Sequence, residues 1–158
     1  MVDKSSGYEG VAAEFERVRS TTVGVARVRN WAKALPRGAA VVDLGCGPGV
    51  PLTEVLVAQG LRVYGIDAAP SFVQAFRRNL PNTPVACEAV QDSTFFGRTS
   101  DGVLAWGLMF LLSAEECRRR LAAVQISILG EYQDEGRNHY FDAVKEMKTI
   151  RPTSEHTL

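Results

Sequence analysis

The sequence predicts an α/β fold, a three-layer sandwich in which helices flank a mostly parallel sheet and an antiparallel hairpin closes the C-terminal end. Short apolar runs alternate with segments of helical periodicity over the first two thirds of the chain, a pattern typical of strand–helix–strand units. A glycine-rich turn at 45–49 joins one apolar run to a helix. Near the C-terminus two strand-like segments flank a polar turn, and this arrangement predicts the hairpin.

The individual elements follow from apolar spacing and from their start and stop residues. Apolar residues recur at helical spacing over 8–18 and 25–35, and Ser113 with Glu116 forms the S-x-x-E capping box of a later helix. We expect one domain over 1–145 and a flexible tail over 146–158. The remaining predicted elements are strands over 40–44, 62–67, 85–87 and 102–106, helices over 52–59, 71–79 and 114–124, and hairpin strands over 126–132 and 139–144.

Composition excludes several classes of protein. The 18 basic and 18 acidic residues balance, so no net field attracts nucleic acid or an anionic membrane. No apolar run has the length of a membrane span, and the N-terminus lacks the apolar core of a signal peptide. Cys46, Cys87 and Cys117 show no metal-ligand spacing. These features predict a cytoplasmic protein without a metal site, a membrane partner or a nucleic-acid partner.

Two apolar strands end in aspartates whose positions are typical of a nucleoside-binding site. The first reaches Asp43 and is followed by alternate glycines, which let the backbone turn sharply and approach a ligand closely. The second ends in Asp67, whose carboxylate can accept both ribose hydroxyls, whether of S-adenosylmethionine (SAM) or of NAD. A dinucleotide G-x-G-x-x-G motif would need glycine where the chain has Val50. A glycine turn that binds nothing is the remaining alternative.

The segment Asp43–Gly49 resembles the first motif of class I SAM-dependent methyltransferases, D-x-G-x-G-x-G after an apolar strand. The resemblance covers about residues 8–145 and implies a Rossmann-like fold with SAM as cofactor. It implies backbone contacts from the glycine loop, ribose binding by Asp67, and contacts from the segment after the third strand and from the end of the fourth. The implied cofactor residues are Asp43, Gly45, Cys46, Gly47, Gly49, Asp67, Ala68, Val90, Gln91, Trp106 and Arg19.

The C-terminal half departs from the family pattern. One helix separates the fourth strand from the hairpin, as if a fifth strand and its flanking segments were lost between Leu121 and Ala122. The segment Ile126–Tyr132 could fill the vacant place beside the fourth strand. Alternatively, a second chain could fill it, which would give a homodimer or a strand-exchanged dimer.

The resemblance implies an enzyme that moves a methyl group from SAM to a small-molecule nucleophile. The sequence assigns no catalytic residue: His139 opens a predicted strand, and His156 lies in the predicted tail. Because the acceptor pocket would be shortened, a SAM-binding protein without turnover is a second hypothesis. An NAD-dependent oxidoreductase is a third.

Overall fold

The computed structural model describes residues 5, 7–108, 113–123, 126–133 and 139–145. The chain divides into two compact units, one over 1–108 and one over 109–158, and each is described here by itself. The expected single domain over 1–145 therefore stays a prediction, and the expected tail over 146–158 lies outside the described residues. No helix among the residues that the structure describes is long and apolar enough to cross a membrane.

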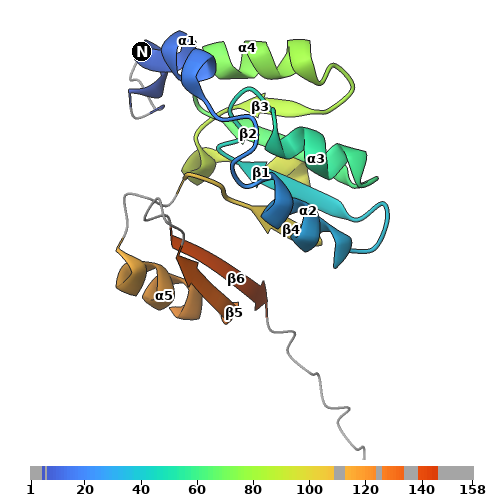
Figure 1. Cartoon of the computed structure of the whole chain (residues 1–158), viewed down its shortest axis with the longest axis vertical. Helices are drawn as coiled ribbons and strands as arrows, with labels where there is room; N and C mark the ends of the chain where they lie inside the picture. Colours follow the sequence, from blue (N-terminus) through green and yellow to red (C-terminus); the bar gives the residue numbers. More distant parts are fainter. Residues whose placement is uncertain (1–4, 6, 109–112, 124–125, 134–138, 146–158) are drawn as a thin grey trace, which may run out of the picture. The chain divides into compact units, whose positions relative to one another are not determined.

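The first unit contains a four-stranded parallel sheet (Figure 1). Its strands are β1 (Ala40–Leu44), β2 (Arg62–Asp67), β3 (Val85–Cys87) and β4 (Gly102–Leu104), in the order β3-β2-β1-β4. The register pairs Asp43 of β1 with Gly65 of β2, and Asp67 with Cys87 of β3. Because all four strands run in the same direction, their carboxyl ends meet at one edge of the sheet.

Four helices of this unit match the sequence prediction closely. They are α1 (Tyr8–Val18), α2 (Val25–Lys33), α3 (Leu52–Ala58) and α4 (Pro70–Asn79). The connection between β3 and β4 contains two short 3₁₀ turns, η1 (Val90–Asp92) and η2 (Phe95–Gly97), which the sequence analysis did not predict. Turns of this length contain too few residues to show an apolar period.

The main core lies between one face of the sheet and the helices α2 and α3. Val41 of β1 and Val63 of β2 carry this face, and both are almost fully buried. A smaller cluster joins Ala12 of α1 to Phe72 of α4. The other members of the main buried cluster are Val28, Ala32, Ala39, Leu52, Val55, Leu56 and Leu61.

The opposite face of β1 borders the segment before β4. Val42 and Leu44, together with Val103, line a mostly apolar surface pocket of about 330 Å³, to which Phe95, Arg98 and Ser100 also contribute. Near it, the ring of Tyr64 packs against Phe96 with 5.3 Å between ring centroids. The glycine loop at 45–49 contributes no residue to the lining of this pocket.

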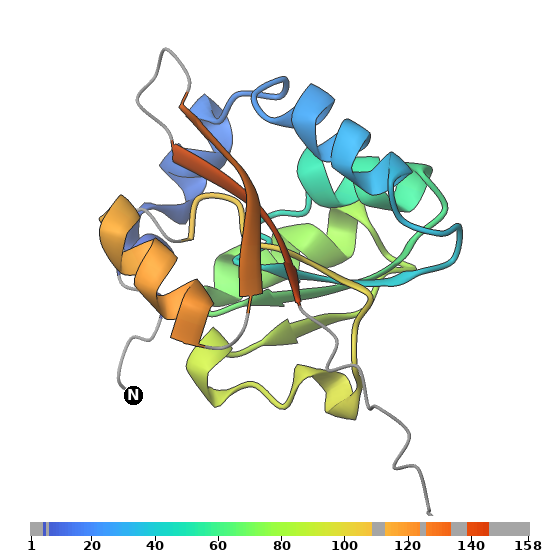
Figure 2. The ribbon, with the colours of Figure 1, turned by 90° about the horizontal axis from the view of Figure 1, so that it is seen from below.

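The second unit contains α5 (Ala114–Ala123) and an antiparallel hairpin of β5 (Ile126–Gln133) and β6 (His139–Lys145), drawn in orange and red in Figure 2. The predicted capping box is confirmed: the Ser113 hydroxyl accepts from the Glu116 amide, and the Glu116 carboxylate accepts from the Ser113 amide. Arg118 of α5 pairs with Glu131 of β5. The parallel sheet with its helices and the C-terminal hairpin confirm the predicted fold class. Within this unit, β5 pairs with β6.

Candidate cofactor-binding site

The loop between β1 and α3 has a backbone shape that glycine favours. Gly45, Gly47 and Gly49 have φ values of 67°, 55° and 79°, in the left-handed region that side chains with a Cβ rarely adopt. The amides of Gly45 and Cys46 both donate to the carbonyl of Ile66, over 2.8 and 3.1 Å. This pair of bonds ties the start of the loop to the end of β2.

Helix α4 supports the loop from the side. A Cβ added to Gly49 would lie 2.8 Å from both Phe76 and Leu80, so the third glycine is needed for close packing. The amide nitrogen of the Asn79 side chain donates to the Pro48 carbonyl over 2.9 Å. Sequence reasoning did not identify these supporting residues, because they follow the motif by some thirty positions and show no pattern of their own.

Asp67 connects β2 to the glycine loop. One oxygen of its half-buried carboxylate accepts from the Gly47 amide over 2.8 Å, and the other accepts from the Ala69 amide over 2.9 Å. Burial raises the pKa of Asp67, while these backbone bonds and Arg19 oppose the shift. An ionised carboxylate has about four lone-pair sites, so Asp67 keeps acceptors for further donors such as ribose hydroxyls.

Asp43 lies beneath the loop as a buried carboxylate. Its Oδ2 accepts from the Thr53 hydroxyl over 2.6 Å, and the two side chains are 3% and 1% exposed. Burial raises the pKa of Asp43 to about 7, and the Thr53 bond and Arg19 oppose this shift. Sequence reasoning missed Thr53, because a threonine in the first turn of a helix also occurs as an ordinary capping residue.

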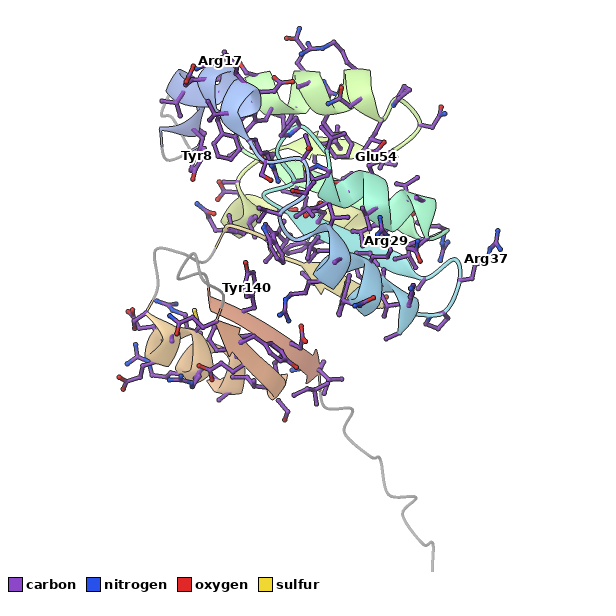
Figure 3. The ribbon with its side chains drawn as sticks, viewed as in Figure 1. Tyr8, Arg17, Arg29, Arg37, Glu54 and Tyr140 are labelled. Carbon is purple, nitrogen blue, oxygen red and sulfur yellow. The ribbon has the colours of Figure 1, made fainter. Side chains whose placement is uncertain are left out.

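Arg19 follows the last turn of α1 and reaches the glycine loop. A Cβ added to Gly47 would lie 2.8 Å from its Nη1. Burial lowers the pKa of Arg19, and the charges of Asp43 and Asp67 oppose that shift. Arg17, by contrast, lies on the outer side of α1 and pairs with Glu14 (Figure 3). The structure thus places Arg19, the arginine that the family resemblance implies, beside the loop, and Arg17 away from it.

The other predicted residues lie in different surroundings. Ala68 is half-buried directly after Asp67, whereas in η1 Val90 is half-buried and Gln91 is exposed. Trp106 packs against the main core and against Gly24, where an added Cβ would lie 2.5 Å from its ring. Leu108, which the sequence analysis did not single out, lies closer to the loop. A Cβ added to Gly45 would be 3.2 Å from Leu108.

These residues fit the methionine and ribose parts of SAM. Without a Cβ at Gly47, the loop backbone lies directly against the guanidinium of Arg19. Two carboxylates and one guanidinium surround it, and these charges complement the ammonium, carboxylate and sulfonium groups of SAM. Among the described residues, no group of three His, Cys, Asp or Glu side chains is arranged to hold a metal ion.

The fold is that of a Rossmann-like domain, with a glycine loop and two strand-end aspartates at the carboxyl edge of its parallel sheet. Residues 41–126, more than half of the chain, match the family described as "Methyltransferase domain". The chain therefore belongs to this methyltransferase family. This family uses SAM as its methyl donor, which confirms SAM as the cofactor that the sequence predicts.

Two curated relatives match shorter stretches. A trans-aconitate 2-methyltransferase from Paracidovorax citrulli is 42% identical over 80 residues, which is 49% of this chain and 27% of that protein. An uncharacterized methyltransferase of Schizosaccharomyces pombe is 57% identical over 37 residues, 23% of this chain and 14% of that protein. The chain thus spans about a quarter or less of the length of these relatives.

Solved structures share the fold. Magnesium protoporphyrin IX methyltransferase from Synechocystis PCC 6803, with bound SAM, superposes with a TM-score of 0.67 at 17% identity, over 90% of this chain and 95% of that one. CalS10, a SAM-bound amino pentose methyltransferase from Micromonospora echinaspora, has a TM-score of 0.52 at 25% identity, over 80% of this chain and 57% of that one.

Proposed function

We propose that this chain binds SAM in the loop between β1 and α3 and transfers its methyl group to a small-molecule nucleophile. The observation that carries the proposal is the hydrogen bond from Gly47 to Asp67. It joins the glycine loop to the carboxylate that would bind the ribose, so both parts of a nucleoside site are held together before a ligand binds. The small-molecule acceptors named for the trans-aconitate and amino pentose enzymes support this acceptor class.

In this proposal the residues of the chain bind and orient the cofactor. SAM supplies an electrophilic methyl group on a sulfonium, so catalysis depends mainly on holding an acceptor in line with it. Asp67 would accept the ribose hydroxyls, and Arg19 would pair with the methionine carboxylate. The predicted contacts of Ala68, Val90 and Gln91 with the adenine, and of Trp106 near the methionine part, belong to the same proposal. No residue is assigned as a general base.

A SAM-binding protein without turnover is the second candidate. Every predicted cofactor residue lies in the unit over 1–108, and the shortened second half leaves less chain to form an acceptor pocket. Binding could therefore persist where methyl transfer does not.

One calorimetric experiment separates the candidates for the cofactor. The purified chain is titrated with SAM, S-adenosylhomocysteine and NADH. We expect binding of the first two and none of NADH; binding of NADH alone would favour an oxidoreductase.

Methyl transfer from labelled SAM to a panel of small carboxylates, amines and phenols then tests turnover. Binding without transfer to any acceptor would favour the second candidate.

We also propose a homodimer or strand-exchanged dimer in the cytoplasm. Among the described residues, the hairpin sheet contains two strands, and such a ribbon is marginally stable by itself. Two of its large apolar side chains are exposed, Leu129 at 72% and Val144 at 47%. Contact with a second copy would bury these side chains.

A further inference from the structure

The buried hydroxyl of Thr53 has no role in the function proposed above. It donates to Oδ2 of Asp43 over 2.6 Å, and the contact joins the first turn of α3 to the end of β1. These two elements flank the glycine loop. A buried carboxylate needs hydrogen-bonded partners to stay ionised, and the buried hydroxyl of Thr53 supplies one.

Charged and titratable groups face Asp43 from three other places. Arg19 follows α1, Asp67 ends β2, and Cys46 lies in the loop itself. Among the described residues, the Asp43 carboxylate accepts one side-chain hydrogen bond, from Thr53 to Oδ2. No fully buried side-chain oxygen of these residues lacks a hydrogen-bond partner, so Oδ1, which has none, is not fully buried. The second oxygen, Oδ1, therefore remains open to a donor from a ligand.

We propose that Thr53 is a positioning residue for the cofactor: by holding Oδ2, its hydroxyl orients the Asp43 carboxylate so that Oδ1 receives the α-ammonium group of SAM. The inference rests on the proposed function, because it takes SAM to occupy the glycine loop. The methionine part carries one ammonium and one carboxylate. With Asp43 facing the first and Arg19 the second, each charge meets its opposite.

The ionisation of Asp43 gives this arrangement a pH signature. The ionised carboxylate attracts an ammonium, and the pKa of Asp43 is raised by burial to about 7. The ratio of the affinity for SAM to the affinity for a ligand without an ammonium should therefore rise with pH up to about 7. At about pH 7.7–8 the SAM amino group itself loses its proton, which reverses the gain. The Thr53 bond lowers the pKa of Asp43, so its loss should move the rise to higher pH.

Calorimetric titration of the full chain with SAM and with 5′-methylthioadenosine tests the role. The second ligand keeps the adenosine and the sulfur but lacks the methionine ammonium and carboxylate, and its sulfur is an uncharged thioether. Thr53→Val keeps the side-chain shape without the hydroxyl. We expect Thr53→Val to weaken SAM binding about tenfold and to change the affinity for 5′-methylthioadenosine by no more than about twofold. Thr53→Ser, which keeps a hydroxyl, should bind SAM as the wild-type chain does. Titrations between about pH 5.5 and 7 keep the SAM amino group protonated.

An equal loss of affinity for both ligands, or no loss for either, would overturn the positioning role. If Thr53→Val does not fold, the wild-type chain decides. A ratio of the two affinities that stays constant with pH then rejects the role of Asp43, and a ratio that rises supports it. Folded wild-type chain that binds neither ligand would instead reject the proposed function itself.

Discussion

Asp67 contributes to the fold as well as to the proposed ribose contact. From its position at a strand end, the sequence suggests a side chain directed at ligand alone. In the structure its two oxygens accept from the Gly47 and Ala69 amides. The carboxylate therefore stabilises the loop even without a ligand, and a substitution here changes both stability and binding.

We expect Asp67→Ala to weaken SAM binding by about 1.5–3 kcal/mol, since hydrogen bonds to a charged acceptor are lost. It should also lower the free energy of unfolding by about 1–3 kcal/mol, because two amides lose their acceptor. Calorimetry and urea unfolding measure the two effects. Glu16→Ala, which removes an exposed carboxylate on α1, is the control and should change neither. Unaltered SAM affinity in Asp67→Ala would reject the ribose contact.

The second residue-scale prediction compares two glycines with similar backbones. Gly47 and Gly38 both have positive φ, but an added Cβ would meet Arg19 at Gly47 and nothing within 4 Å at Gly38. Valine at either position should cost about 1–2 kcal/mol of backbone strain. Gly47→Val should in addition abolish SAM binding, whereas Gly38→Val should retain it. Thermal melts and calorimetry check this; SAM binding by Gly47→Val near the wild-type affinity would exclude the loop as the cofactor site.

At the scale of elements, α1 is attached to α4 by polar and aromatic contacts. The Glu9 carboxylate accepts from the amide and the hydroxyl of Ser71, over 3.0 and 2.6 Å. A negative charge is favourable at this place, the N-terminus of α4. Phe15 of α1 packs against Phe72 of α4 with 5.5 Å between ring centroids. Since Arg19 directly follows α1, these contacts also fix where its guanidinium lies.

Glu9→Ala should therefore loosen α1, with a loss of about 0.5–1.5 kcal/mol. We expect faster amide hydrogen exchange in α1 and a weaker affinity for SAM, because Arg19 is held less firmly. Glu14→Ala is the matched control: its carboxylate pairs with Arg17 within the same helix, so its loss should not detach α1 from α4. Similar exchange rates in the two variants would contradict the attachment through Glu9.

At the scale of the whole molecule, the testable property is the association of two chains. Multi-angle light scattering should give the mass of a dimer at micromolar concentration. Leu129→Glu places a charge on the exposed apolar side of the hairpin and should give a monomer. Gln133→Glu, on an exposed residue of the same strand, should leave the dimer intact. A monomeric mass of the wild-type chain at every dilution would reject the proposed dimer.

Local pattern was enough to predict the positions of most helices and strands. The strand that ends at Asp67, the helix that begins after Ser113 and the terminal hairpin all agree with the structure to within a few residues. Apolar period, capping residues and glycines act over short distances along the chain, so the sequence itself displays them. The glycine motif likewise predicted the family and its cofactor. Both follow from residues that are close in sequence.

Tertiary structure decided which distant side chains meet the loop. The packing of helices against the sheet places Thr53 beneath Asp43 and Asn79 on the Pro48 carbonyl. It also brings Arg19, which the sequence analysis had named, against Gly47. Packing also placed Trp106 against Gly24 and the main core. These contacts join residues on different elements, and no local periodicity encodes them, because they arise only when apolar faces are buried together.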